Sequence, residues 1–225
     1  MNQLALPRDP VHAKVWLERA AELGHPDAML RLGYLELRTD APDKEVRAIA
    51  WFHRAAARGN VSAMKSLGFS YRDGSGAAID LHEAQRWFLR AIEAGDKPSL
   101  MYIGRLHAYH LNSPETAIPW FEQVASSGGS DGAFELALLF GDRKSGVFDP
   151  AKAVRWYKAV ANKSRFSAPR ALVALARFTR DGQGTEQNAE LAKSYLEIAL
   201  QIMHPKNPLR KEAQTLYDDI ATSLI

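Results

Sequence analysis

Three short motifs in this chain carry residue types that could do chemistry. The stretch Gly128–Gly132 reads GGSDG and matches the Gly-x-Ser-x-Gly pattern, in which a strained turn exposes a nucleophilic serine. His107 and His110 lie three residues apart, a spacing at which two imidazoles on one helix could share a metal ion. The glycine-rich stretches at residues 71–76 and 178–184 could cradle a phosphate. Each motif needs its own structural context, so the surrounding sequence decides among them.

The surrounding sequence is a repeat with a period of about 35 residues. Tryptophan recurs at Trp16, Trp51, Trp87, Trp120 and Trp156, and Tyr195 stands where a sixth would be due. A small residue follows each of these aromatics after four positions, and a glycine follows four positions later in the first four units. A fixed period of this size is typical of helical-repeat solenoids.

Each unit is predicted to form a pair of helices. The first helix carries a small residue, then Leu four positions later and Gly five positions later, as in Ala63, Leu67 and Gly68, so that all three share one face. Glycine inside a helix costs about 1 kcal/mol relative to alanine, and we expect close approach of the neighbouring helix backbone to compensate. The second helix is expected to begin at a capping residue, namely Asp9, Asp80, Ser113, Asp149 or Asn188. No segment shows sustained alternation, so no sheet is expected.

The repeat register assigns a structural role to the three motifs. Both glycine-rich stretches join a first helix to a second helix and follow no strand, so we interpret them as turns. Gly128 ends a helix, and a serine hydrolase that uses Ser130 is therefore an unfavoured alternative. His107 and His110 have no third ligand nearby, so they are expected at solvent-facing helix ends. The sequence predicts no enzyme activity, no metal and no cofactor.

Composition sets few further limits. The 225 residues include no cysteine, which excludes thiolate catalysis and disulfides, and the net charge is +3. No apolar run approaches the length of a membrane span, and the first ten residues do not resemble a signal peptide. The sequence as given therefore predicts a cytoplasmic protein, or a periplasmic or secreted one if a signal peptide has been removed.

Residues 63–96 closely resemble the unit of the Sel-one-like repeat family, a variant of the tetratricopeptide-type helical repeats. The matching positions are Ala63, Leu67, Gly68, Tyr71, Gly74, Gly76, Asp80, Ala84, Trp87, Ala91 and Gly95. Residues 28–59 match but lack the Gly-x-Gly turn, residues 99–128 are shortened at that turn, and residues 132–163 and 171–203 drift further.

The resemblance implies an all-α fold, a right-handed superhelical solenoid of about five to six helix pairs. We interpret residues 1–225 as one such domain, with an N-terminal half repeat at 9–24, repeats at 28–203 and a C-terminal capping helix at 207–224. The capping helix is expected because its apolar residues share one face, namely Leu209, Ala213, Leu216, Tyr217, Ile220 and Leu224.

The resemblance also implies a function in protein–protein contact. Bacterial members include scaffolds, host-interaction factors and immunity proteins against secreted toxins. The leading hypothesis is a non-catalytic interaction scaffold or adaptor that binds another protein. The main alternative is a dedicated inhibitor or immunity protein for one secreted toxin or effector.

The partner is expected on the concave surface, which the first helices line in this family. Five positions of each first helix point away from the predicted core face at 100° per residue. They supply a partner-binding stripe of aromatic, apolar and Arg side chains: Tyr34, Phe69, Tyr102, Arg105, Phe134, Leu138 and Arg177. This composition is typical of interface hot spots. The alternative is that strong curvature buries these side chains between repeats.

A secondary basic patch is predicted between residues 143 and 180, which hold ten Lys or Arg and one acidic residue. We expect Lys152, Arg155 and Lys158 on a second helix and Arg170 on a first helix. The patch could bind an acidic protein or an anionic glycan, although a solvated surface is the simpler interpretation. Nucleic acid is not expected, because aromatic residues are not interleaved with the basic ones.

Overall fold

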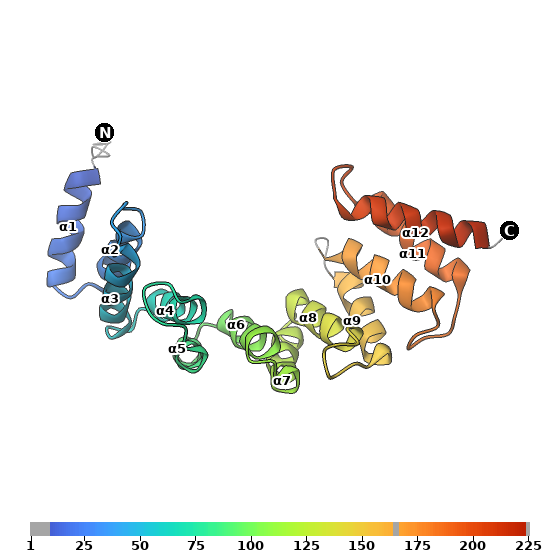
Figure 1. The fold of residues 1–225 in the computed structure, drawn as a ribbon, viewed down its shortest axis with the longest axis horizontal. Coiled ribbons are helices and arrows are strands. Elements are labelled where there is room, and N and C mark those ends of the chain that lie inside the picture. Colours follow the sequence, from blue (N-terminus) through green and yellow to red (C-terminus); the bar gives the residue numbers. More distant parts are fainter. Residues whose placement is uncertain (1–9, 164–166, 224–225) are drawn as a thin grey trace, which may run out of the picture. The chain divides into compact units, whose positions relative to one another are not determined.

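The computed structural model describes residues 10–163 and 167–223. In these residues the chain forms twelve α-helices and one π-helix and contains no strand (Figure 1). The predicted cap at Asp9 and the last residue of the predicted capping helix, Leu224, lie outside the described residues.

The helices fall into two compact units, residues 1–103 and 104–225. The first unit contains α1 (Pro10–Glu22), α2 (Pro26–Glu36), α3 (Lys44–Ala56), α4 (Val61–Asp73), α5 (Leu81–Glu93) and most of α6 (Ser99–Arg105). The second unit contains the π-helix η1 (Leu106–His110), α7 (Pro114–Ser126), α8 (Ser130–Gly141), α9 (Pro150–Lys163), α10 (Ala168–Arg180), α11 (Ala189–Ile202) and α12 (Leu209–Ser223).

Helix pairs form each unit. A first helix packs on the second helix that follows it, as α2 does on α3, α4 on α5, α8 on α9 and α10 on α11. The second helix then packs on the first helix of the next pair, as α3 does on α4, α7 on α8 and α9 on α10. The predicted all-α fold of helical repeats is confirmed.

The three positions that hold the small residue, Leu and Gly in the repeat are buried in each first helix, as predicted. Where the third position is glycine, a phenylalanine ring lies against it. A Cβ added at Gly68 would lie 2.5 Å from Cε1 of Phe88, a fully buried side chain. The same contact recurs between Gly33 and Phe52 and between Gly104 and Phe121, at 2.4 Å each. At Gly68 and Gly104 the nearest atoms all belong to the ring, so the expectation of close backbone approach is wrong there. At Gly33 the carbonyl oxygen of Ala48 in α3 also lies close, at 3.1 Å, beside the ring.

Side-chain caps begin most of the second helices, as predicted. Asp80 Oδ1 accepts a hydrogen bond from the Glu83 amide at 2.9 Å, and Asn188 Oδ1 accepts one from the Leu191 amide at 2.8 Å. Asp149 caps α9 in the same way. Ser113 precedes α7 without such a bond, because its hydroxyl donates to the carbonyl oxygen of Leu111 instead.

Both glycine-rich motifs are turns. Gly74 and Gly76 have φ values of 74° and 80°, in the left-handed region that favours glycine. A Cβ at Gly76 would lie 2.2 Å from the carbonyl oxygen of Glu45, at the start of α3. Gly184 approaches Pro150, at the start of α9, equally closely. The second glycine of each motif therefore lets the turn contact the second helix of the preceding pair.

The predicted C-terminal helix covers the last repeat. α12 packs on α11 and buries Ala213, Leu216 and Ile220. The Arg210 guanidinium donates to the carbonyl oxygen of Leu200 at 2.5 Å and to that of Met203 at 3.1 Å, which supplies partners for the end of α11.

Replacing Gly68 by Ala should lower the stability of the protein. Gly→Ala in a helix normally gains about 0.5–1 kcal/mol, but here the new methyl group would overlap the buried Phe88 ring. We expect the free energy of unfolding to fall by about 1–3 kcal/mol, as for other overpacked cores. Urea denaturation followed by circular dichroism measures it. In a Phe88→Leu background the same change should cost less, and an equal cost there would contradict the ring contact.

Deleting residues 207–225 should also destabilise the chain. The deletion exposes buried apolar side chains of α11, including Leu196 and Met203, and removes the partners of the last carbonyl oxygens of that helix. Aggregation in light scattering, or a lower thermal midpoint, is the expected result. A truncated chain that stays monomeric and equally stable would show that α12 is not a structural cap.

Candidate interaction surface

The predicted stripe residues lie on the first helices, and none of them is buried. Tyr34, Arg105 and Arg177 are exposed, and the other four are partly exposed. The stripe residues are therefore not fully buried between repeats in either unit. Its role in binding stays a prediction.

In the first unit the stripe residues pack as an aromatic surface. The ring of Phe69 contacts that of Tyr102 edge-on, with centroids 4.8 Å apart, and both rings contact the buried Phe88. The Arg72 guanidinium lies 4.9 Å from the Phe69 centroid. Tyr34 contacts the next buried ring, Phe52, in the same way, and its hydroxyl lies 2.8 Å from Ser66 Oγ.

In the second unit Arg105 belongs to a cluster that the sequence did not predict. Its Nε donates to Glu135 at 2.6 Å, and the Tyr109 hydroxyl donates to the other oxygen of that carboxylate at 2.5 Å. Glu135 is buried, although its position predicted an exposed side chain. Burial and the bond to Glu135 raise the pKa of Tyr109 well above its usual value. Tyr109 lies in η1, where the wider π-helical turn departs from the expected helical phase.

The second unit also brings three stripe residues to one hollow of about 240 Å³. The hollow lies on α8, α9, α10 and α12 and is lined by Phe134, Leu138, Tyr157, Arg170, Val173, Ala174, Arg177, Leu209 and Glu212. Arg170 lies over the Phe134 ring, 5.2 Å from its centroid, and Arg177 forms an ion pair with Glu212. Arg170 is thus grouped with stripe residues and not with the rest of the predicted basic patch.

The other members of the basic patch lie on α9. Lys152 pairs with Asp149 at 3.4 Å and lies 5.1 Å from the centroid of the Phe140 ring. Arg155 lies 5.8 Å from the neighbouring Trp156 ring, and Lys158 is exposed. None of the three lines the hollow.

Tyr157 is the lining residue that sequence reasoning missed. It follows Trp156 at the position that carries the buried phenylalanine in earlier repeats, and its side chain is 5% exposed. Burial raises the pKa of Tyr157 to about 12. Its hydroxyl forms no hydrogen bond with any residue that the structure describes. A tyrosine at a repeat position occupied by phenylalanine was the signal that could have revealed it.

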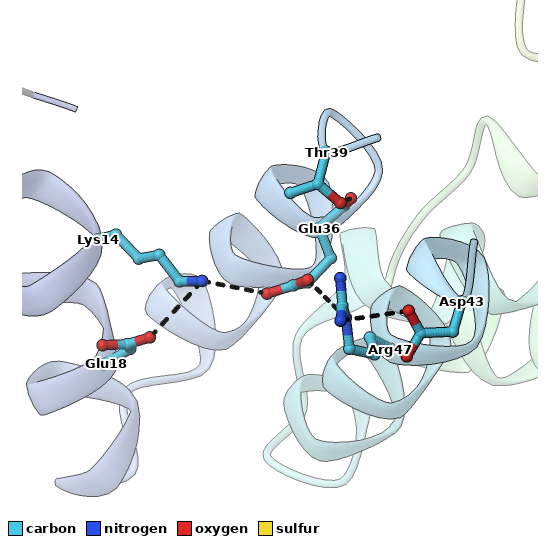
Figure 2. Close-up of polar contacts among 6 residues, drawn as sticks. All are labelled: Lys14, Glu18, Glu36, Thr39, Asp43 and Arg47. Carbon is cyan, nitrogen blue, oxygen red and sulfur yellow. Dashed lines mark hydrogen bonds and ion pairs between the residues drawn. The ribbon is translucent and has the colours of Figure 1, made fainter. Parts of the chain in front are cut away.

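A buried carboxylate links the first three helices (Figure 2). Glu36 of α2 accepts from Arg47 Nε of α3 at 2.8 Å and from Lys14 Nζ of α1 at 3.5 Å. Arg47 also pairs with Asp43 at 3.2 Å. A buried carboxylate needs such partners, and here Lys14 and Arg47 supply them, so Glu36 is not available as part of an open site.

The structure places the catalytic and metal motifs in helical surroundings. Ser130 is the first residue of α8, and the preceding element is helix α7, so the strand of a nucleophile elbow is missing there. His107 is buried, which corrects the expectation of a solvent-facing side chain, whereas His110 is exposed. Both lie in η1, and His107 stands at the repeat position of Glu36, which is buried in α2. Among the described residues, no three His, Asp or Glu side chains lie close enough to hold a metal ion.

No described helix is long and apolar enough to cross a membrane.

Comparison with known families matches the Sel1 repeat to residues 1–25, 26–60, 61–96, 130–164 and 169–201. The unmatched segment between them contains η1 and the shortened copy predicted at residues 99–128. No curated protein matches the chain.

Solved structures share the fold. The crystal structure of c5321, a protective antigen of uropathogenic Escherichia coli with an SLR fold, has a TM-score of 0.67 and 23% identity over 98% of this chain and 46% of that one. A Sel1 repeat protein from Oxalobacter formigenes has a TM-score of 0.67 and 25% identity over 92% of this chain and 59% of that one. This chain therefore spans about half the length of these two structures. Immunity protein Pa5087 from Pseudomonas aeruginosa overlaps 87% of this chain and 81% of its own at a TM-score of only 0.33 and 18% identity.

Lowering the pH should destabilise the protein through His107. Burial lowers the pKa of His107 in the folded chain, so the unfolded chain binds the proton more readily. Stability should therefore be full above the unfolded-state pKa of about 6.5 and decrease as the pH falls through it toward the folded-state pKa. His107→Gln should lose less thermal stability than the wild type between pH values of about 7.5 and 5.5.

The exposed His110 supplies the control, since His110→Gln should keep the full pH dependence. Burial also lowers the pKa of His53, so His53 contributes to the pH dependence of stability. His107→Gln should therefore reduce this pH dependence without abolishing it. A pH dependence identical in both variants and the wild type would contradict the assignment.

Proposed function

Because the chain belongs to the Sel1 repeat family, we propose that it is a non-catalytic scaffold or adaptor that binds another protein through the stripe on its first helices. Sel1 repeat proteins generally act as protein–protein interaction scaffolds. The observation that carries the proposal is that large aromatic and Arg side chains, fully or partly exposed, stand at positions that a merely solvated helix would fill with small polar residues.

The packing of these side chains suits them to binding. Phe69 and Tyr102 are held against each other and against the buried Phe88. A partner that contacts them therefore loses little of their side-chain freedom, which lowers the entropic cost of association. Aromatic rings also supply contact area with few torsions to freeze.

A dedicated inhibitor or immunity protein would use the same surface. The two hypotheses differ in what binding does to the partner. A scaffold joins its partner to a further protein, whereas an inhibitor inactivates it. Identifying the partner by contact with the stripe tests both.

Photo-crosslinking should locate the partner on the first helices. A photoreactive phenylalanine analogue placed at Phe69 or Phe134 should crosslink one protein in the source cells. Ala50 of α3 and Glu122 of α7 are exposed residues of second helices and serve as controls. Equal crosslinking from these controls would contradict binding by the stripe.

The crosslinked partner should bind less tightly when Tyr102 and Arg105 are both replaced by Ala. If both are hot spots, each truncation costs about 2 kcal/mol, or roughly 30-fold in affinity. Isothermal titration calorimetry with the purified partner measures the loss. Unchanged affinity of the double variant would move the site away from α6.

A further inference from the structure

The geometry points to a carboxylate-binding site in the hollow of the second unit, where Arg170 and Tyr157 would hold an acidic side chain of an extended partner segment. This inference rests on the proposed function and deepens it, since it names the chemistry of the segment. It is argued from the charges, the unpaired groups and the size of the hollow.

Arg170 is the cation in the hollow that lacks a counter-ion. Its guanidinium lies over the Phe134 ring and forms no ion pair with any described residue. Arg177, in contrast, is paired with Glu212. The lining residues that titrate or carry charge are Arg170, Arg177, Glu212 and Tyr157. Two arginines face one glutamate, and the phenol is neutral, so one positive charge is left unmatched. One carboxylate would balance it.

Tyr157 offers a hydrogen-bond donor in the same place. The residue is only 5% exposed, and its hydroxyl, which reaches the solvent, has no hydrogen-bond partner among the described residues. Electrostatic interactions with both Arg170 and Arg177 act on this hydroxyl. A carboxylate bound to Arg170 could accept a hydrogen bond from the phenol hydroxyl with its second oxygen.

The walls of the hollow favour a side chain over a larger anion. Phe134, Leu138, Val173 and Leu209 are apolar and can contact the methylene groups of a glutamate. A volume of about 240 Å³ is below the roughly 300–1,000 Å³ of pockets that hold drug-sized ligands. A doubly charged phosphate would leave negative charge unmatched beside Glu212. The chemistry therefore fits an acidic peptide better than a nucleotide or nucleic acid.

The surface beyond the hollow can hold a second acidic residue. A groove of about 570 Å³ between α10 and α12 shares Arg177 and Glu212 with the hollow. In this groove Arg180 pairs with Asp181. Lys211 forms no ion pair with any described residue, and Asp219 also lines the groove. Arg170 and Lys211 thus flank the Arg177–Glu212 pair as two cations without counter-ions.

Selection of peptides from a random twelve-residue phage-display library against the full chain tests the inference. The peptides are joined to the coat protein through their C-termini, so an acidic side chain must supply any carboxylate. The selected pool should be enriched in Asp and Glu. Selected peptides, synthesised with amidated C-termini, should bind Arg170→Gln at least about 10-fold more weakly, as expected for loss of a charge-assisted hydrogen bond.

Two further variants test the contribution of the Tyr157 hydroxyl and of the overall positive charge of the protein, apart from that of Arg170. Tyr157→Phe keeps the ring and removes the hydroxyl, and it should weaken binding by about 3- to 10-fold. Arg19→Gln removes the same charge from an exposed position of α1, outside the hollow and the basic patch, and should leave affinity unchanged at physiological salt. Circular dichroism confirms that each variant is folded.

Three results would overturn the inference. The first is a pool without acidic enrichment, or no selected peptide. The second is equal binding to Arg170→Gln and wild type. The third is that inorganic phosphate or a single-stranded oligonucleotide binds in an Arg170-dependent manner while acidic peptides do not. Peptides that bind independently of Arg170 but are lost on Tyr102→Ala would overturn this site alone, whereas equal crosslinking from second helices would remove the proposed function.

Discussion

The contact of a phenylalanine ring with a helical glycine is the interaction on which the other packing depends. In the unit of Gly68 and Phe88, the ring occupies the volume of the missing side chain, so a larger residue at position 68 would separate the two helices. The exposed aromatic surface is built on the same ring, because Phe69 and Tyr102 both contact Phe88. The positions of the proposed binding residues therefore follow from a core contact.

The repeat varies this contact, and one of the variant residues, Tyr157, lines the hollow. In the fourth and fifth pairs, alanine replaces the glycine at Ala137 and Ala176, and the ring position holds Tyr157 and Leu196. Tyrosine adds a hydroxyl to a buried ring, and that hydroxyl finds no partner among the described residues. The hydroxyl reaches the solvent, so it is available as a hydrogen-bond donor to a ligand in the hollow.

Periodicity predicted much of the fold, and only part of the surface. Spacing identified the helix pairs, the Gly76 turn and the caps at Asp80 and Asn188, because each depends on nearby residues. The ring over each glycine was missed, since a helical wheel gives the buried face but not its partner. The burial of His107 was missed because its motif was interpreted as a helix end, although it stands at the repeat position of the buried Glu36. The Tyr109–Glu135 bond was missed because a helical wheel does not give the contacts of one helix with another.

The two stripe arginines illustrate how burial decides which ion pair a partner could replace. Arg105 pairs with Glu135, whose side chain is 7% exposed, and separating them would leave a buried carboxylate with only Tyr109 as a partner. Arg177 pairs with Glu212, whose side chain is 47% exposed, and such pairs contribute about 0–1 kcal/mol. Water can solvate Glu212 when a partner carboxylate takes its place. Arg177 can therefore exchange its ion pair with Glu212 for one with the partner. Arg105 instead stays paired with Glu135, which holds its guanidinium in a fixed orientation. Its remaining N–H donors can then contact a partner.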